Sequence, residues 1–267
     1  MPDLRRFVSV DGCVVRITSR VHADPDAPVF VLVHGIGMSH RYLSRLHREL
    51  SARGTVASLD LPGFGGLPKP GTDLGVARMA DVIVGVLPAI TERPVVLVGH
   101  SMGAQWVVEA AVRHPARVDG VAVIGPVADD AHRSLPAQAR ALALDSLGES
   151  PAINAIVFTD YVRCGIRWYR TQARHMLAYP LEERARELTV PLLVIRGAND
   201  PIAGRAWCRR VRDAAPLARL VEIPGGHHVA QQSSPGAVAS AVLAHFTGVW
   251  PVVDPAQSAV PVQDGRA

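Results

Sequence analysis

The stretch LVGHSMGAQ, Leu97–Gln105, decides the fold, because it places a serine between two glycines where a predicted strand meets a predicted helix. The apolar run Val95–Val98 is short enough for a buried strand, and helical periodicity then continues to His114. Glycines two positions either side of Ser101 permit a sharp turn in which a Cβ would collide with neighbouring backbone. A serine that only caps a helix does not need both glycines, so the pattern favours an exposed nucleophile.

The composition is that of a folded chain. Hydrophobic residues make up 48% of the 267 residues and charged residues 19%, far from the signature of disorder. The formal net charge is +4, but the basic residues are scattered and aromatic residues make up only 5%. A nucleic-acid reader would gather basic and aromatic side chains in one patch, so we expect no nucleic-acid partner.

The cysteines and the apolar runs indicate the compartment. Cys13, Cys164 and Cys208 are odd in number and widely spaced, which fits neither a disulfide framework nor a zinc site. The start of the chain lacks the apolar core of a signal peptide, and no run reaches the roughly 18 apolar residues of a membrane span. We therefore expect a cytoplasmic protein with no membrane span.

Strands and helices alternate along most of the chain. Arg6–Arg20 reads as a hairpin that turns at Asp11-Gly12, and Val29–His34 as a strand buried on both faces. The alternation continues with helices at 39–52, 76–90, 102–114, 205–214 and 235–246, and with strands at 55–60, 95–98, 118–124, 191–197 and 217–223. This βαβ rhythm predicts an α/β fold, with a mostly parallel, doubly wound sheet of about eight strands.

The rhythm breaks between Gly125 and Pro191, where about sixty residues carry helical periodicity without a convincing strand. We therefore predict a core formed by residues 1–126 and 191–248, with an inserted helical cap at residues 127–190. Residues 249–267 are rich in proline and lack periodicity, which predicts a flexible C-terminal tail.

A serine nucleophile needs a base, and the base needs an acidic partner that fixes its tautomer. The loop IPGGHHVAQQSSP after the last strand carries His227 and His228, and either could be the base. The strand LLVIRG runs into a loop that carries Asp200 at the same carboxyl edge. The chain order Ser101, Asp200, His228 is that of α/β-hydrolases. Asp129, after an earlier strand, is the alternative acid.

Four motifs together give the chain its resemblance to the α/β-hydrolase fold, over about Phe7 to Phe246. Besides GHSMG, the sequence has the HGxG loop at His34–Gly37, the DxPGFG segment at Asp60–Gly65 and the GxxDP segment at Gly197–Pro201. The chain is similar to the capped, single-domain members, which include esterases, lactonases and carbon–carbon bond hydrolases. No cofactor or metal is implied.

The resemblance also implies roles for individual residues. In such proteins the backbone N–H groups of the residue after His-Gly and of the residue after the nucleophile form the oxyanion hole, here Ile36 and Met102. The catalytic histidine usually lies seven residues before the proline that opens the last helix, which from Pro235 favours His228 over His227. His34 is expected to hold the oxyanion loop, and we expect no catalytic role for His100.

The predicted cap offers candidate pocket residues. Four arginines fall on one helical stripe, and Tyr161 and Trp168 fall on the opposite one. The arginines are Arg163, Arg167, Arg170 and Arg174. A solvated face over a packed face explains this pattern. The sharper hypothesis is that Tyr161 and Trp168 overhang Ser101 and that one arginine binds a substrate carboxylate.

These inferences predict a serine hydrolase that cleaves an ester, lactone or thioester of a small, hydrophobic acyl substrate through an acyl-enzyme. A carbon–carbon bond hydrolase, an acyltransferase or a perhydrolase would use the same three residues. A ligand-binding receptor on the same fold is the alternative from another class. The sequence leaves the substrate and the oligomeric state open.

Overall fold

The strands form one mixed sheet. The computed structural model describes residues 3–129 and 133–247, so the predicted tail at 249–267 lies outside the described residues. In the part that it describes, eight strands have the order β1-β2-β4-β3-β5-β6-β7-β8. They are β1 (Leu4–Val10), β2 (Cys13–Arg20), β3 (Val29–Val33), β4 (Thr55–Asp60), β5 (Val95–His100), β6 (Val118–Ile124), β7 (Leu192–Gly197) and β8 (Ala218–Ile223). The pairs β1/β2 and β2/β4 are antiparallel and the others are parallel. The prediction of a mostly parallel sheet of about eight strands is confirmed.

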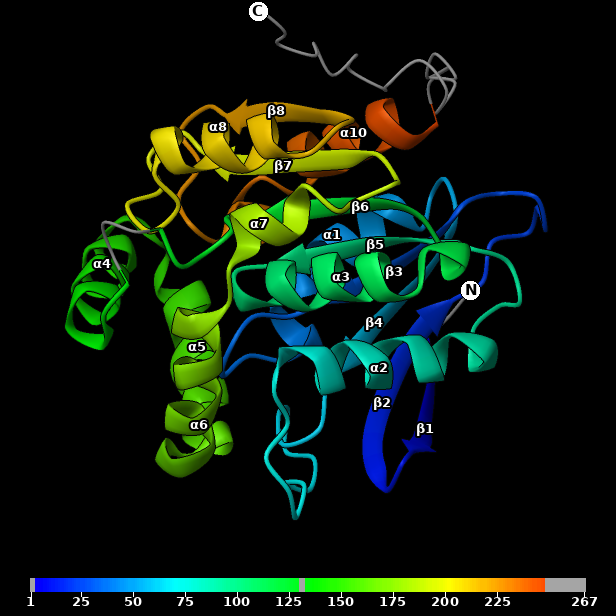
Figure 1. Ribbon diagram of the computed structural model, residues 1–267, viewed down its shortest axis with the longest axis horizontal. Helices are drawn as coiled ribbons and strands as arrows, with labels where there is room; N and C mark the ends of the chain where they lie inside the picture. Colours follow the sequence, from blue (N-terminus) through cyan, green and yellow to red (C-terminus); the bar gives the residue numbers. More distant parts are fainter. Residues whose placement is uncertain (1–2, 130–132, 248–267) are drawn as a thin grey trace, which may run out of the picture.

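Helices cover both faces of this sheet (Figure 1). The α-helices that accompany the strands are α1 (Ser44–Leu50), α2 (Val76–Val86), α3 (Met102–Arg113), α8 (Arg205–Ala214), α9 (Ala230–Ser233) and α10 (Pro235–Phe246). Three short 3-10 helices are η1 (His40–Leu43), η2 (Leu87–Ala89) and η3 (Pro115–Arg117). Helices α2, α3 and α8 lie on one face, whereas α1 and α10 pack together on the other.

Alternate residues of the strands enter two separate cores. On β3, Val31 and Val33 join the core under α2, α3 and α8, whereas Phe30 and Leu32 join the core under α1 and α10. All four side chains are fully buried. Burial on both faces explains why the central strands read as continuous apolar runs in the sequence.

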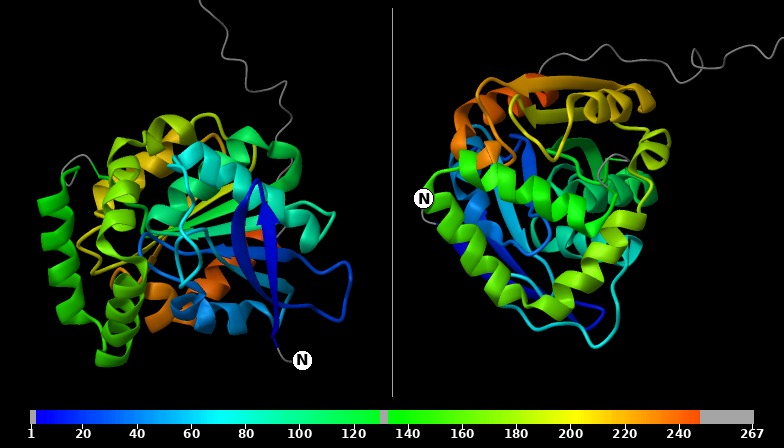
Figure 2. Two further views of the ribbon diagram at one scale, coloured as in Figure 1. Left: turned by 90° about the horizontal axis from the view of Figure 1, so that it is seen from below. Right: turned by 90° about the vertical axis from the view of Figure 1, so that its left-hand side faces the viewer.

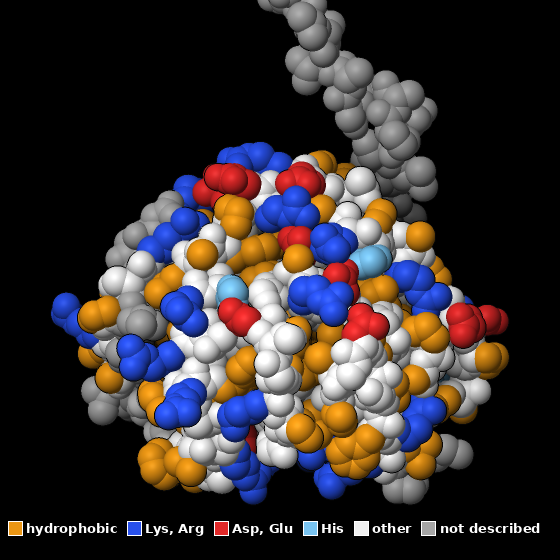
Figure 3. Space-filling view, turned by 60° about the horizontal axis from the view of Figure 1, so that its bottom comes forward, with side chains coloured by type: hydrophobic (Ala, Val, Ile, Leu, Met, Phe, Trp, Pro, Cys, Tyr) orange, Lys and Arg blue, Asp and Glu red, His pale blue; other side chains and the backbone are white. Residues whose placement is uncertain are grey.

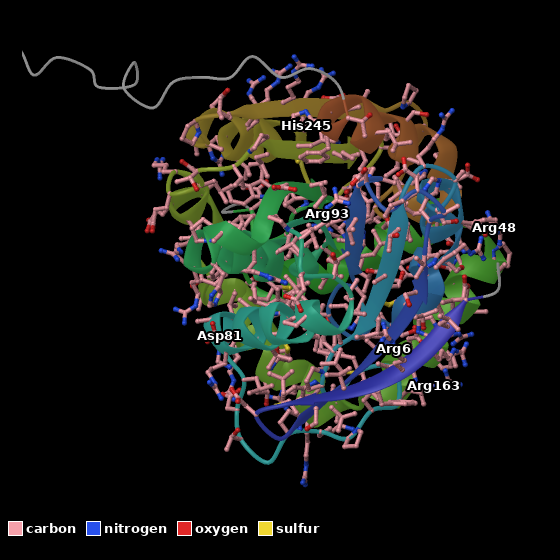
Figure 4. The ribbon with its side chains drawn as sticks, turned by 90° about the vertical axis from the view of Figure 1, so that its right-hand side faces the viewer. Arg6, Arg48, Asp81, Arg93, Arg163 and His245 are labelled. Atoms are coloured by element: carbon pink, nitrogen blue, oxygen red, sulfur yellow. The ribbon has the colours of Figure 1, made fainter. Side chains whose placement is uncertain are left out.

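The antiparallel edge begins with the predicted hairpin. Asp11 and Gly12 have φ angles of 47° and 75°, the left-handed conformation that a two-residue hairpin turn requires. Strand β1 is the outer strand of this edge, where Arg6 lies and donates a hydrogen bond to the carbonyl of Ala89 (Figure 4). The face shown in Figure 3 carries basic side chains scattered among acidic and hydrophobic ones.

Between β6 and β7, the described residues form four helices. They are α4 (Leu135–Gly148), α5 (Pro151–Cys164), α6 (Ile166–Ala178) and α7 (Leu181–Ala185). Helices α4, α5 and α6 stand beside the carboxyl ends of the parallel strands, at the left of Figure 1 and in front in the right view of Figure 2. They therefore lie where the sequence places its candidate functional side chains.

Candidate active site

Ser101 sits on a strained turn between β5 and α3. Its φ and ψ angles are 56° and −122°, which L-residues rarely adopt. A Cβ on Gly99 would lie 2.4 Å from the carbonyl oxygen of Gly103, and one on Gly103 would lie 2.6 Å from the carbonyl oxygen of His34. Both glycines are therefore required by backbone contacts, as the sequence predicts, and the turn holds the serine out at the end of the strand.

His228 and Asp200 meet at the same edge of the sheet. The His228 Nδ1 lies 2.9 Å from Asp200 Oδ2, and both side chains are buried. Asp200 Oδ1 accepts the backbone N–H groups of Ile202 and Ala203 at 2.8 and 3.0 Å. Both carboxylate oxygens of Asp200 are thus bound to fixed partners, which is typical of a carboxylate that orients an imidazole.

The charges of this pair stabilise each other. Burial lowers the pKa of His228, but the Asp200 carboxylate and its hydrogen bond outweigh burial and raise it overall. Burial raises the pKa of Asp200, but the charge and hydrogen bond of His228 and the two backbone N–H groups lower it overall. Asp200 therefore stays ionised and holds the proton of neutral His228 on Nδ1, which leaves Nε2 as the basic atom.

Ser101 and His228 line one pocket, which we call the Ser101 pocket, with about 550 Å³ of empty volume. Gly35, Ile36 and the side chains of α4, α5 and α6 complete its wall. Its lining residues are Gly35, Ile36, Met38, Tyr42, His100, Ser101, Val127, Leu142, Val157, Tyr161, Tyr169, Met176, Ile202, His228 and Val229. The wall is mostly apolar, with a few convergent polar groups, as is usual for small-molecule sites.

The loop after β3 presents its backbone to Ser101. His34 Nε2 accepts the Leu61 N–H at 3.1 Å, so Nδ1 carries the proton and donates to the Gly35 carbonyl at 2.7 Å. Burial lowers the pKa of His34, which keeps the ring neutral in this tautomer. In a trans peptide the C=O and the next N–H point in opposite directions, so this bond directs the Ile36 N–H away from His34.

Two backbone segments, the loop at Gly35 and the start of α3, lie next to the serine. A Cβ on Gly35 would lie 2.8 Å from the Cβ of Ser101, so the loop lies directly against it. Met102 is the first residue of α3, and its N–H belongs to the unpaired first turn of that helix. Ile36 lines the Ser101 pocket and Met102 directly follows Ser101, and their role as oxyanion donors stays a prediction.

His100 links this loop to the loop of His228. The Gly35 N–H donates to the Tyr42 hydroxyl at 2.7 Å, and this hydroxyl lies 2.7 Å from His100 Nδ1. His100 Nε2 lies 2.9 Å from the His228 carbonyl, which only accepts, so Nε2 carries the proton and Tyr42 donates to Nδ1. Burial lowers the pKa of His100 to about 3, so the ring is neutral. A neutral ring has one donor and one acceptor nitrogen, which fixes the direction of both hydrogen bonds. His100 is a hydrogen-bonded neighbour of His228, and no motif in the sequence points to the role of Tyr42.

The two aromatic candidates lie in different places. Tyr161, on α5, lines the Ser101 pocket, and a Cβ on Gly37 would lie 2.3 Å from its ring. Trp168, on α6, packs against Gly63 and against the ring of Phe64, with centroids 6.1 Å apart. The described residues that line the pocket from α6 are Tyr169 and Met176.

A helix break explains this difference. The stripe of candidate residues predicts one continuous helix, but Gly165 has a φ of 73° and separates α5 from α6. The four arginines of the stripe are exposed. Arg163 lies 3.8 Å from Asp160. None of the four is among the described residues that line the Ser101 pocket.

His227, the alternative base, and Asp129, the alternative acid, are not among the described residues that line the Ser101 pocket. The His227 ring lies against the backbone of Gly148 on α4, where a Cβ would approach Cε1 to 2.1 Å. Asp129 lies 3.4 Å from Arg210. Of the two histidines, His228 is the one that lines the pocket and contacts Asp200.

Gly125 is a site residue that the sequence analysis missed. It follows β6 with a φ of 54°, and a Cβ there would lie 3.0 Å from His228 Nδ1 and 3.2 Å from Asp200 Oδ2. Its backbone thus forms a wall of the His228–Asp200 pair. A glycine directly after a buried strand was the available signal, but its contact partners are more than seventy residues away in the sequence.

The described residues contain no cluster of three or more His, Cys, Asp or Glu side chains suited to a metal ion. Among the helices of the described part, none has the length and apolarity to cross a membrane.

Comparisons with known proteins agree with this architecture. The chain is 27% identical to 2-(acetamidomethylene)succinate hydrolase of Mesorhizobium japonicum over 254 residues, which cover 86% of this chain and 91% of that protein. Its fold is similar to that of an enol-lactonase from Burkholderia xenovorans LB400, with a TM-score of 0.78, 22% identity and coverage of 91% of this chain and 100% of the other. It is also similar to 2-hydroxy-6-oxo-6-phenylhexa-2,4-dienoate hydrolase from Rhodococcus sp. strain RHA1, with a TM-score of 0.75, 21% identity and coverage of 92% and 99%.

A family model extends the agreement over most of the chain. The model of the alpha/beta hydrolase family matches residues 30–241, which include the elbow and the loops that follow β3, β7 and β8. The resemblance found in the sequence motifs is thereby confirmed. The chain belongs to the alpha/beta hydrolase family and is a hydrolase.

Proposed function

We propose that the protein is a serine hydrolase that cleaves an ester, lactone or thioester through an acyl-enzyme. One observation carries the proposal: Ser101, on its strained turn, shares a pocket with His228, whose Nδ1 is held 2.9 Å from Asp200. This leaves the basic Nε2 of His228 as the atom that can accept the serine proton.

In the first half of the reaction, His228 Nε2 takes the proton of Ser101 as Oγ attacks the substrate carbonyl. The negative charge that forms on the carbonyl oxygen is stabilised by the N–H groups of Ile36 and Met102. Each such donor contributes about 3 kcal/mol to transition-state stabilisation. The tetrahedral intermediate then collapses, the C–O or C–S bond to the leaving group breaks, and His228 gives its proton to that group.

In the second half, water attacks the acyl-enzyme while His228 takes one of its protons. The bond between the acyl carbon and Ser101 breaks, and the proton returns to Oγ. The acid product leaves, and the enzyme is restored. Asp200 remains ionised throughout and stabilises the imidazolium in both halves.

The pocket wall supports a small, apolar acyl substrate. Ile36, Met38, Val127 and Leu142 are among its lining residues, and its polar side chains belong to tyrosine, histidine and serine. The exposed position of the cap arginines gives no support to a carboxylate contact from them. The names of the relatives include a lactonase and hydrolases of small organic acids, which fits a small-molecule substrate.

The proposal is tested with a panel of p-nitrophenyl esters, lactones and acyl thioesters in ¹⁸O-labelled water, with products read by mass spectrometry. We expect one ¹⁸O atom in the released acid and a loss of about 10⁴-fold or more in kcat for Ser101→Ala. Turnover of the panel that survives in Ser101→Ala would contradict the proposal. Products without ¹⁸O, with the acyl group on another acceptor, would assign acyl transfer instead.

A further inference from the structure

Helix α4 places two buried carboxylates against the loop that carries His228. Asp145, on α4, is 2% exposed, and Glu149, the residue directly after the last residue of α4, is 9% exposed. Asp145 Oδ1 accepts the backbone N–H of His228 at 2.8 Å, and Glu149 Oε1 accepts that of Val229 at 3.3 Å. The mechanism above uses neither carboxylate, although buried acids are costly unless they have a partner.

The bond from Asp145 completes the anchoring of His228. Its N–H is bound by Asp145 from α4, its carbonyl by His100 from the end of β5, and its ring by Asp200 after β7. The backbone groups on both sides of the side chain are thus fixed by different elements. Such anchoring matters because a base that is displaced by about 1 Å loses much of its rate.

The contact between α4 and the loop is direct. The His227 ring lies on the backbone of Gly148, which is one helical turn from Asp145 on α4. The Nδ1 atom of His227 is 3.8 Å from Asp145 Oδ1. Asp145 is not among the described residues that line the Ser101 pocket, whereas His228, which it binds, is one of them.

The carboxylates also act on the charge of His228. Asp200 and His100 contact the ring of His228, whereas Asp145 and Glu149 bind the backbone of its loop and act on the ring through their charge. Burial lowers the pKa of His228, and after Asp200 the charges of Asp145 and Glu149 raise it. His100, with its pKa lowered to about 3 by burial, is neutral and does not oppose them at neutral pH.

We propose that Asp145 is a positioning residue of the active site, which fixes the backbone of His228 and stabilises its imidazolium form, with Glu149 supporting the same loop at Val229. The inference rests on the proposed function, because it requires His228 to be the base. It makes α4 a part of the reaction machinery as well as a wall of the pocket.

The test measures the rate constant for phosphonylation of Ser101 by a small fluorophosphonate as a function of pH, which needs no knowledge of the substrate. Asp145→Asn keeps the shape and an acceptor oxygen but removes the charge. We expect its rate to reach half of the plateau at a lower pH than in the wild type, because the imidazolium loses a stabilising charge. Asp145→Ala also removes the acceptor, and we expect a loss of about tenfold or more at the plateau.

Asp160→Asn is the matched control. Asp160 is a fully buried carboxylate on α5 that also binds the core, through Ser39 and Arg41, but it does not contact the His228 loop. We expect Asp160→Asn to leave unchanged the midpoint, that is, the pH at which the rate of labelling reaches half of its plateau. A midpoint in Asp145→Asn equal to that of the wild type would overturn the inference. If Asp145→Ala does not fold, the test still decides, because it depends on the pH midpoint of Asp145→Asn.

The two proposals fail in different ways. A folded wild-type protein that is not labelled at Ser101 contradicts the proposed function. A wild-type protein that is labelled with a clear pH midpoint, which Asp145→Asn does not shift, contradicts only the role of Asp145.

Discussion

Gly125 shows how much of the site depends on single backbone positions. The His228 and Asp200 side chains lie where a Cβ of residue 125 would contact them, and the φ of 54° is itself unfavourable for other residues. Ser101 has a left-handed φ of nearly the same value without being glycine. Strain of this kind persists when the surrounding structure imposes it, here through close packing at Gly99 and Gly103.

We predict that Gly125→Ala lowers kcat by about 10²-fold, because the new methyl group displaces His228 from Asp200. Gly12→Ala is the control for backbone strain, since Gly12 also has a positive φ but has open space at its Cβ position. Steady-state kinetics with thermal melts separate the two effects. Equal loss of activity in both variants at equal stability would contradict the role of Gly125.

The pH dependence of the reaction follows from His228. Its pKa is raised above 6.5, and only the neutral ring accepts the serine proton, so kcat/KM should fall as pH drops through a midpoint above 6.5. Asp200→Asn removes the main stabilising charge and the acceptor that fixes the tautomer. We predict that it lowers kcat by about 10⁴-fold and moves the midpoint to lower pH. A midpoint in Asp200→Asn at or above that of the wild type would refute this assignment.

At the scale of elements, segments with local signals were predictable. The predicted bounds of β4, β6, α8 and α10 match the structure, because each carries a clear period between turn residues. The break at Gly165 was missed, since the apolar stripe continues across it and a single glycine is tolerated within many helices.

The candidate site also contains residues with a local sequence signal and residues without one. Ser101, Asp200 and the His227-His228 pair follow strand ends, where parallel topology brings distant loops together. Asp145 and its partner His228 are 83 residues apart. Their contact depends on how α4 docks on the core, and periodicity within α4 carries no information about that.

Helices α4, α5 and α6 also predict a preference for the length of the acyl chain. A second apolar groove, the outer groove, has about 790 Å³ of empty volume and shares Leu142, Tyr161 and Tyr169 with the Ser101 pocket. Phe158 and Val162 line it and are 72% and 65% exposed. An acyl chain too long for the inner pocket would extend here and cover these side chains.

We predict that kcat/KM rises by about fourfold for each methylene that reaches the outer groove, since a buried CH₂ is worth about 0.8 kcal/mol. Val162→Ser should reduce this gain and leave acetate ester hydrolysis unchanged. Kinetics with p-nitrophenyl esters of increasing length measure both. A length profile that is the same in Val162→Ser and the wild type would exclude the outer groove as an acyl site.

At the scale of the whole molecule, Asp60 joins segments from three parts of the chain. Its fully buried carboxylate at the end of β4 binds Arg16 on β2 and both the backbone and the ring of His40 in η1. Burial raises the pKa of Asp60, but the His40 bond and the nearby positive charges lower it overall. A lowered folded pKa means that this carboxylate stabilises the protein above its unfolded pKa, and that the contribution is lost as pH falls.

We predict that Asp60→Asn lowers the free energy of unfolding by about 3 kcal/mol near neutral pH, because it removes the buried carboxylate that binds the partly buried Arg16 and His40. The difference from the wild type should shrink below about pH 4, where Asp60 of the unfolded wild-type chain takes up a proton before Asp60 of the folded chain does. Urea unfolding at several pH values measures this. A difference that stays constant or grows on acidification would contradict it.

The central claim is that Ser101 is a nucleophile activated by His228. The most direct measurement is to incubate the folded protein with a fluorophosphonate probe, beside Ser101→Ala and His228→Ala, and to locate the label by intact and peptide mass spectrometry. We predict one label on Ser101 of the wild type and none on either variant. A wild-type protein that stays unlabelled, or a label that persists in His228→Ala, would contradict the account.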